Sequence, residues 1–344
     1  MANIFSFLFG GSGQFTSTKK YEKEQNKEKE SYQRFVNDSS SKQIYDYEEL
    51  EELINSDGYK NRVAELKNAK QYANSEEANQ LKEFSKLQKN KEIKWYFNTL
   101  KQKDFSEQKE WEITFEDDFD NPELDASKWM TGYYWGKTLM NDNYVLSHEK
   151  QFYCDGNISV RNGVVRLTTK KEQARGKSWN PAIGFLEKDF DYTSALISTG
   201  QSFRQKYGKF EAKVRFSGAY PIVNVFWMLG ETILPQIDVF KTSKSKGKEL
   251  ESGVHALKEK NKPESLLSSV KGAPFKGQYF IYSLEWSENL LVWKINGKEV
   301  LRETKNVPNE PMYLTFCTTL PENPKSSLLP AYMDIDWVRC YKKV

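Results

Sequence analysis

The stretch that decides the fold is Leu234-Pro235-Gln236-Ile237-Asp238-Val239-Phe240-Lys241, near the middle of the chain. Apolar and polar residues alternate along it, which is typical of a strand whose successive side chains point to opposite faces. Gln236 and Asp238 are therefore expected on one face. Between Asp238 and Lys241 the alternation slips by one residue, and a β-bulge would return Lys241 to that face. The stretch predicts a bulged strand that carries three polar groups in a row.

Short alternating runs separated by turn residues surround this strand from Trp111 onward, and they indicate an all-β sandwich. Several longer motifs occur in a fixed order along this part of the chain. They are Phe115 to Asp120, His148-Glu149 with Gln151 and Tyr153, Tyr207 to Lys213, Phe226 to Gly230, and Met333 to Tyr341. Taken together, these motifs resemble the family 16 glycoside hydrolases, the laminarinase and β-glucanase relatives. The resemblance implies a concanavalin A-like jelly-roll sandwich over residues 108–344.

The resemblance also implies roles for the polar residues of the central strand. The family pattern is Glu-x-Asp-x-x-Glu, in which the first Glu is the nucleophile, the Asp tunes it and the second Glu is the general acid/base. This chain has Gln236, Asp238 and Lys241 at those positions. Glycoside hydrolysis with retention requires two carboxyl groups, and neither an amide nor a lysine ammonium replaces them. The sequence therefore predicts a degenerate site without catalytic residues, and a protein that is not an enzyme.

Other residues are candidates for binding a glycan without cleaving it, because aromatic faces stack on sugar rings and amides bind hydroxyl groups. The segments that contain Trp135 and Trp179 read as loops, and His148 replaces an Asn that binds substrate in the family. An alternative reading makes Trp227 a core residue and pairs Asp238 with Lys241 in an ion pair. The glycan-binding candidates are Trp135, His148, Trp179, Trp227, Gln236, Asp238 and His255.

No cofactor is required by this reading. Family members often hold a calcium ion, and the resemblance places Glu116 and Asp336 at the matching positions. A structural calcium ion at these two residues is therefore an expectation. The chain has three cysteines without metal-ligand spacing, which indicates free thiols.

Before residue 108 the composition changes, and the chain is expected to be α-helical over residues 18–107, after a flexible segment 1–17. Helices are predicted from about Lys19, near Tyr47, around Val63, Leu66 and Ala69, and after Ser75. Their apolar stripes are narrow, so such a layer needs a partner surface, which is the sandwich behind it, a second copy of the chain or another protein. The overall fold class is thus a helical region followed by a β-sandwich.

Composition limits the location and the partners. The net charge is +3, from 51 basic and 48 acidic residues, so no global field draws the chain to nucleic acid or membranes. The apolar run Ile4 to Phe9 lacks the flanks of an export signal, and no run approaches the roughly 18 apolar residues of a membrane span. The expected location is the cytoplasm or a virion.

Three functions compete on this evidence. The first is a catalytically inactive structural or interaction module of a larger assembly, such as a phage particle, with the helical region as the docking element. The alternative is a non-catalytic protein that binds β-glucan oligosaccharides. The third is an active hydrolase with displaced carboxylates, for which Glu231 or Glu187 are candidates.

Overall fold

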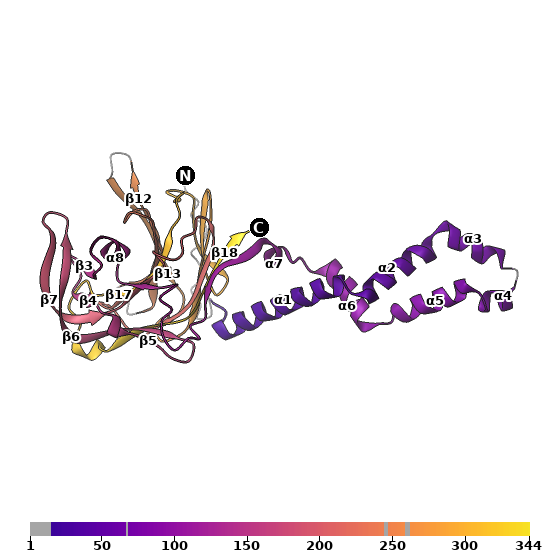
Figure 1. Cartoon of the computed structure of the whole chain (residues 1–344), viewed down its shortest axis with the longest axis horizontal. Helices are drawn as coiled ribbons and strands as arrows, with labels where there is room; N and C mark the ends of the chain where they lie inside the picture. Colours follow the sequence, from indigo (N-terminus) through magenta and orange to yellow (C-terminus); the bar gives the residue numbers. More distant parts are fainter. Residues whose placement is uncertain (1–14, 67, 244–246, 259–261) are drawn as a thin grey trace. The chain divides into compact units, whose positions relative to one another are not determined.

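The structure is a computed structural model, and it describes residues 15–66, 68–243, 247–258 and 262–344. Within it the chain forms two compact units, one of Met1–Tyr21 with Glu112–Val344 and one of Glu22–Trp111. Helices come first in the sequence and strands follow, which confirms the predicted fold class (Figure 1). The predicted flexible segment 1–17 lies almost entirely outside the described residues.

Five helices of the helical part begin directly after a Ser or Asn residue that caps their N-terminus. Side-chain oxygens of Ser41, Ser56, Asn68, Ser75 and Asn90 accept a hydrogen bond from a backbone N–H of the first turn, which no intrahelical carbonyl can satisfy. The helices are α1 (Thr18–Ser39), α2 (Lys42–Asn55), α3 (Asp57–Glu65), α4 (Ala69–Ala73), α5 (Glu76–Leu87), α6 (Lys91–Gln102) and α7 (Ser106–Glu110).

One predicted helix is divided in two. Leu66 has an extended backbone at the end of α3, and Asn68 then caps the new helix α4. The apolar spacing of Val63, Leu66 and Ala69 was therefore misleading, because a capping Asn interrupts it. Tyr59 joins the two halves of this region, since its hydroxyl donates to the Glu77 carbonyl at 2.7 Å.

The rest of the chain consists mainly of strands. They are β1 (Trp111–Asp117), β2 (Met130–Thr131), β3 (Tyr144–Leu146), β4 (Gln151–Tyr153), β5 (Ile158–Val160), β6 (Val165–Asn180), β7 (Gly184–Ser194), β8 (Leu196–Ser198), β9 (Gly208–Phe216), β10 (Val223–Leu229), β11 (Gln236–Thr242), β12 (Glu249–Lys258), β13 (Lys262–Lys271), β14 (Phe280–Ser287), β15 (Leu290–Ile295), β16 (Lys298–Glu303), β17 (Tyr313–Thr319) and β18 (Ala331–Lys343). Helix α8 (Tyr134–Met140) and the short 3₁₀ turns Asp155–Asn157 and Ser326–Leu328 interrupt them.

These strands form two sheets packed as a sandwich (Figure 1). The seven-stranded sheet has the order β13-β12-β11-β10-β17-β8-β2. The eleven-stranded sheet has the order β16-β15-β14-β9-β18-β6-β7-β4, with β1 paired to β18 and both β3 and β5 paired to β6. The predicted bulged strand is β11, and it lies inside the seven-stranded sheet with β10 and β12 on either side.

The inter-sheet core is rich in aromatic residues. Phe226 and Phe316 stack with ring centroids 4.3 Å apart, and Phe240 contacts Tyr282 of the other sheet at 4.2 Å. Burying one such side chain contributes roughly 1.5–3 kcal/mol to folding. Ile237 and Phe240 of β11 point into this core. The polar side chains of β11 must therefore lie on the opposite face of the seven-stranded sheet, which we call the site face.

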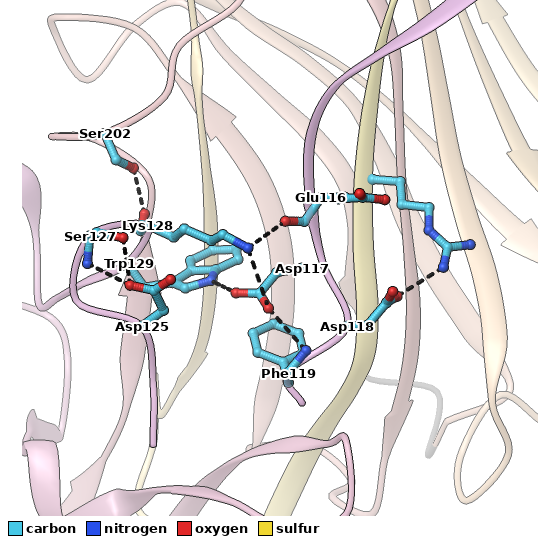
Figure 2. A network of polar contacts seen from close by, with 10 residues as sticks. Glu116, Asp117, Asp118, Phe119, Asp125, Ser127, Lys128, Trp129 and Ser202 are labelled. Carbon is cyan, nitrogen blue, oxygen red and sulfur yellow. Dashed lines mark hydrogen bonds and ion pairs between the residues drawn. The ribbon is translucent and has the colours of Figure 1, made fainter. Parts of the chain in front are cut away.

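A network of polar contacts surrounds Asp117 in the motif Phe115 to Asp120. Figure 2 shows the Asp117 carboxylate between the indole of Trp129 and the backbone of Phe119. Trp129 Nε1 donates to Asp117 at 2.7 Å, the Phe119 N–H donates at 2.9 Å, and Lys128 Nζ lies 3.8 Å away. The buried carboxylate is thus fully satisfied, and it fixes the left-handed backbone of Phe119 (φ 52°).

Candidate functional site

Strand β11 contains the β-bulge that the sequence predicts. Opposite β10, Asp238 pairs with Trp227 and Phe240 pairs with Phe226, so Val239 is the extra residue. Opposite β12, the same irregularity falls between Asp238 and Lys241. Because residues directly opposite in a sheet share a face, this register returns Lys241 to the site face with Gln236 and Asp238.

Two side-chain hydrogen bonds, one from the opposite sheet and one from the neighbouring strand β12, hold the bulge in place. The Asp238 carbonyl accepts from Nε1 of Trp293, a buried residue of the opposite sheet, at 2.9 Å. The Val239 carbonyl accepts from the Ser252 hydroxyl at 2.9 Å. A bulge leaves backbone groups outside the regular ladder, so these side chains satisfy them and fix the position of the site strand.

The Asp238 carboxylate is the polar centre of the site. Its side chain is 0% exposed, and it accepts from Gln236 Nε2 at 2.5 Å and faces His255 Nε2 at 3.1 Å. Ser265 Oγ lies 2.6 Å from the other ring nitrogen of His255. A carboxylate only accepts hydrogen bonds, so a neutral His255 carries its proton on Nε2 and accepts from Ser265 at Nδ1.

The alternative ion pair between Asp238 and Lys241 does not occur among the described residues. The register places Lys241 opposite Glu251, whereas Asp238 lies opposite Gly253 and beside His255. The prediction was wrong because it considered β11 alone, while the partners of Asp238 are set by the neighbouring strand.

Three buried polar atoms near Asp238 make no hydrogen bond within the described part of the chain. They are the indole nitrogen of Trp227, the hydroxyl of Thr315 and the hydroxyl of Tyr313. Trp227 of β10 pairs with Asp238 of β11 on one side and with Thr315 of β17 on the other. Two residues along β10, Leu229 pairs in the same way with Gln236 and Tyr313. Burying a polar group without a partner costs free energy, so such atoms are expected to meet a bound water molecule or a ligand.

Apolar side chains cover part of the site face. A second hydrophobic cluster joins residues of this face to tyrosines of β3, β4 and the segment just before α8; the members on this face are Leu196, Val223, Val225 and Cys317. Trp227 packs at the edge of this cluster, so it belongs to the site face and not to the inter-sheet core. The covered strands are β8, β17 and β10, while Gln236, Lys241 and His255 on β11 and β12 stay partly exposed.

The two predicted loop tryptophans lie in regular elements. Trp135 is in helix α8, and its Nε1 donates to the Glu231 carbonyl at 2.7 Å. Trp179 is in strand β6, and its ring packs on Phe185 at 4.7 Å. The prediction of loops was wrong here because β6 and β7 extend into a long two-stranded ribbon (Figure 1). Both tryptophans pack against the cluster that covers the site face.

The sequence analysis missed the structural role of Glu149. Its buried carboxylate accepts from the backbone N–H of Leu146 in β3 at 2.6 Å and from the side-chain amide of Gln151 in β4 at 3.1 Å. Hydroxyl groups of Tyr133, Tyr153 and Thr319 complete the set. Burial is the main cause that raises the pKa of Tyr133 and Tyr153 well above the ordinary value. The motif around Gln151 and Tyr153 was the available signal, but it did not reveal that these residues share one carboxylate.

Three other candidate residues lie away from this centre. His148 is exposed in the turn between β3 and β4. The Glu231 carboxylate pairs with Arg204, and Glu187 pairs with Arg175 at 3.4 Å on the β6–β7 ribbon. Both acids of the displaced-carboxylate alternative are therefore committed to arginines, and the structure does not bring either to Asp238.

The two residues predicted to hold a calcium ion, Glu116 and Asp336, each have a lysine ammonium group nearby. Lys213 Nζ lies 2.7 Å from the Asp336 carboxylate. Lys128 Nζ donates to the backbone carbonyl of Glu116 at 2.8 Å (Figure 2). A lysine ammonium group thus pairs with the Asp336 carboxylate, whereas Lys128 contacts the backbone of Glu116 and not its carboxylate. Within the described ranges, no group of three or more His, Cys, Asp or Glu residues could hold a metal ion.

Comparisons with known proteins agree with this architecture. The family model described as glycosyl hydrolases family 16 matches residues 143–339. The endo-1,3-1,4-beta-glycanase ExsH of Rhizobium meliloti is 26% identical over 251 residues, which cover 66% of this chain and 51% of that protein. The chain thus spans about half the length of this relative and of its homologue EglC. The laminarinase catalytic domain of Thermotoga maritima superimposes with a TM-score of 0.56 at 24% identity, over 68% of this chain and 99% of that one.

These findings correct one prediction. The relatives are named as endo-glycanases and glucosidases, which are enzymes. The prediction that this protein is not an enzyme is therefore contradicted. It was wrong because it equated two positions of one strand with the whole site, although neighbouring strands contribute side chains to the same face. In the described part of the chain, no helix is long and apolar enough to cross a membrane.

Proposed function

This chain belongs to glycosyl hydrolase family 16, and from that premise we propose that its site face binds a β-linked glucan around Asp238. The observation that carries the proposal is the group of partly exposed side chains around this carboxylate, Trp227, Gln236 and His255, beside buried polar atoms that lack protein partners. A sugar ring offers hydroxyl groups that both donate and accept, and an apolar face that stacks on an indole. Trp227 can supply both contacts, through its ring and its N–H.

The hydrolytic step of a glycanase needs two carboxyl groups. On β11 and β12, the carboxyl side chains on the site face are those of Asp238, Glu249 and Glu251, and the register places Glu251, the nearer of the two glutamates, diagonal to Asp238. Diagonal neighbours in a sheet lie about 7–8 Å apart, and inverting enzymes separate their carboxyls by about 6.5–9.5 Å. We propose this pair for cleavage, with Glu251 as the acid that protonates the leaving oxygen and Asp238 as the base that activates water. The Asp238 carboxylate is 0% exposed, so a bound glycan must displace Gln236 or His255 before water reaches it. This pair would invert the anomer, in contrast to the nucleophile mechanism that the family pattern implies.

The experiment is a calorimetric titration with β-1,3- and mixed-linkage glucan oligosaccharides, with release of reducing sugar followed in parallel. Binding is expected to weaken about tenfold in Gln236→Ala, which corresponds to about 1.4 kcal/mol. Sugar release is expected to fall at least about 100-fold in both Asp238→Asn and Glu251→Gln. The control is Glu187→Gln, because this acid lies on the β6–β7 ribbon.

The anomer formed at the new reducing end tests the assignment independently. Proton NMR taken early in the reaction should show inversion if Asp238 and Glu251 act through an intervening water. Retention would reject this pair. Loss of activity in Glu231→Gln instead would support the displaced-carboxylate alternative, and an absence of glucan binding would reject the proposal as a whole.

A second proposal concerns the helical unit, which we infer to be a docking element for another copy of the chain. Its small core of Ile44, Ile93 and Tyr96 is buried, whereas Tyr45 (65%) and Leu100 (53%) are exposed. Sedimentation equilibrium should detect association that weakens in Tyr45→Ser and Leu100→Ser. A monomer at about 100 μM would reject self-association. Assembly into a larger particle such as a virion stays a prediction.

A further inference from the structure

The eleven-stranded sheet has a cavity on its outer face, remote in the topology from β11. Four of its lining residues form one row across neighbouring strands. Arg166 of β6 and Arg215 of β9 both pair in register with Asp334 of β18, between them. Ser159 extends the row on one side, opposite Arg166. The cavity has a volume of about 300 Å³ and is lined by Ser159, Arg161, Asn162, Val164, Arg166, Arg215, Tyr279 and Asp334.

The charges that line this cavity do not balance. Three guanidinium groups, of Arg161, Arg166 and Arg215, face the single carboxylate of Asp334, which leaves an excess of two positive charges. Lys213 and Asp336 lie nearby, but they pair with each other at 2.7 Å and leave the excess unchanged. Because Asp334 is buried under the arginines, the excess charge faces the cavity.

Arg166 and Arg215, which contact Asp334 and which we call the inner arginines, are held in place before any ligand arrives. Arg166 donates to Asp334 from Nε at 2.6 Å and from Nη2 at 3.0 Å. Arg215 donates to it from Nε at 3.2 Å and from Nη2 at 2.5 Å. Their guanidinium planes lie over aromatic rings, Arg166 at 4.2 Å from Tyr332 and Arg215 at 4.6 Å from Tyr279. Groups fixed in this way lose little conformational freedom when they bind.

The same hydrogen bonds leave donors for a second acceptor. A guanidinium carries five N–H donors, and each inner arginine uses only its Nε and Nη2 side on Asp334. The Nη1 groups remain, together with the hydroxyl of Ser159, the amide of Asn162 and the exposed guanidinium of Arg161 at the rim. Arginine forks of this kind match the geometry of oxyanions.

We infer that this cavity is a binding site for an oxyanion, either a free phosphate or sulfate ion or an acidic group, such as a carboxylate, carried on an anionic sugar. The volume admits a group of this size with part of a sugar ring. Asp334 orients Arg166 and Arg215, and Arg161 closes the site from the rim. The inference does not depend on the proposed glucan site, because neutral glucan offers no charge to these arginines.

The test measures binding of sodium phosphate, sodium sulfate and sodium glucuronate by calorimetry, with sodium chloride at equal ionic strength as the reference. The variant is Arg161→Gln, which removes a rim charge without disturbing the buried Asp334. The matched control is Arg175→Gln, an exposed arginine on the β6–β7 ribbon. At least one oxyanion should bind, about tenfold more weakly in Arg161→Gln and equally well in Arg175→Gln.

Each outcome bears on the inference. Binding of phosphate or sulfate identifies a site for the free ion, whereas binding of glucuronate alone identifies the sugar-borne group. Equal binding to wild type and Arg161→Gln, or heats that match those of chloride, would overturn it. A second variant, Arg215→Lys, keeps the charge but removes the fork, so it should also weaken binding if the geometry matters. Glucan titration of Arg161→Gln should be unchanged, which separates this site from the site face.

Discussion

At the scale of single residues, the site depends on which buried polar groups have partners and which do not. Asp238 is fully buried, yet two side chains reach it from its own face. Thr315 and Tyr313 are each 1% exposed, and their hydroxyls find no acceptor or donor in the described chain. A satisfied group stabilises the fold, whereas an unsatisfied one costs stability unless a ligand completes it.

This difference predicts the effect of removing single hydroxyl groups. Tyr313→Phe and Thr315→Val should leave the free energy of unfolding unchanged or raise it, because no intramolecular hydrogen bond is lost. Both should weaken glucan binding about fivefold to tenfold. Urea unfolding and calorimetric titration of the same samples measure the two effects. A fall in stability without a change in affinity would show that these hydroxyls serve the fold.

A second prediction concerns the thiol groups. Burial is the main cause that raises the pKa of Cys154, and Glu172 and Asp155 add to it. Cys317 and Cys340 are fully buried. In native protein, iodoacetamide should therefore modify Cys154 alone, more slowly at pH 8 than an ordinary cysteine, and faster as the pH rises and the thiolate forms. Peptide mass spectrometry measures this, with urea-unfolded protein as the control. Rapid modification at pH 8 would contradict the expected direction.

At the scale of elements, the position of the bulged strand β11 depends on the opposite sheet. The Trp293 indole reaches across the core to the Asp238 carbonyl. On the other side of the sandwich, Asp117 receives hydrogen bonds from Trp129 and the Phe119 backbone. In both places a buried tryptophan N–H donates a hydrogen bond to a strand, to Asp238 of β11 or to Asp117 of β1. These side chains therefore fix the positions of β11 and β1 in the sandwich.

Removing either connection should cost stability, but only one should affect the site. Trp293→Phe leaves the Asp238 carbonyl without its donor, and Asp117→Ala leaves two buried donors unsatisfied. Each should lower the free energy of unfolding by about 1–3 kcal/mol. Trp293→Phe should also weaken glucan binding, while Asp117→Ala should not. Asp118→Ala, which breaks an exposed ion pair with Arg339, is the control and should cost less than about 1 kcal/mol. Equal affinities in all variants would contradict a role for Trp293 in the site.

At the scale of the whole molecule, the chain combines two units with separate cores. Ile93 is 2% exposed in the core of the helical unit, whereas Leu167 is fully buried in the core of the sandwich. Long-range strand pairing defines the sandwich, while the helical unit relies on capped helices and a small aromatic cluster. We therefore expect the two units to lose their structure independently.

A matched pair of core substitutions tests this independence. Ile93→Ala should lower the stability of the helical unit by about 2–4 kcal/mol, and Leu167→Ala should do the same for the sandwich. Hydrogen exchange measured by mass spectrometry resolves the two effects. In Ile93→Ala, protection should fall in residues 22–111 only, and glucan binding should persist. Loss of protection throughout the chain in both variants would show that the two units unfold together.

The sequence by itself determined the fold class, the bulge at Asp238 and the helix start at Ser75. Local patterns encode these features, because alternation, a slipped period and a capping residue act over a few neighbouring residues. Only the tertiary structure decided that His255 and not Lys241 faces Asp238, that Glu149 collects its donors, and that Arg166 and Arg215 share Asp334. Each of these contacts joins strands far apart in the chain, and the register between strands depends on how the whole sandwich packs.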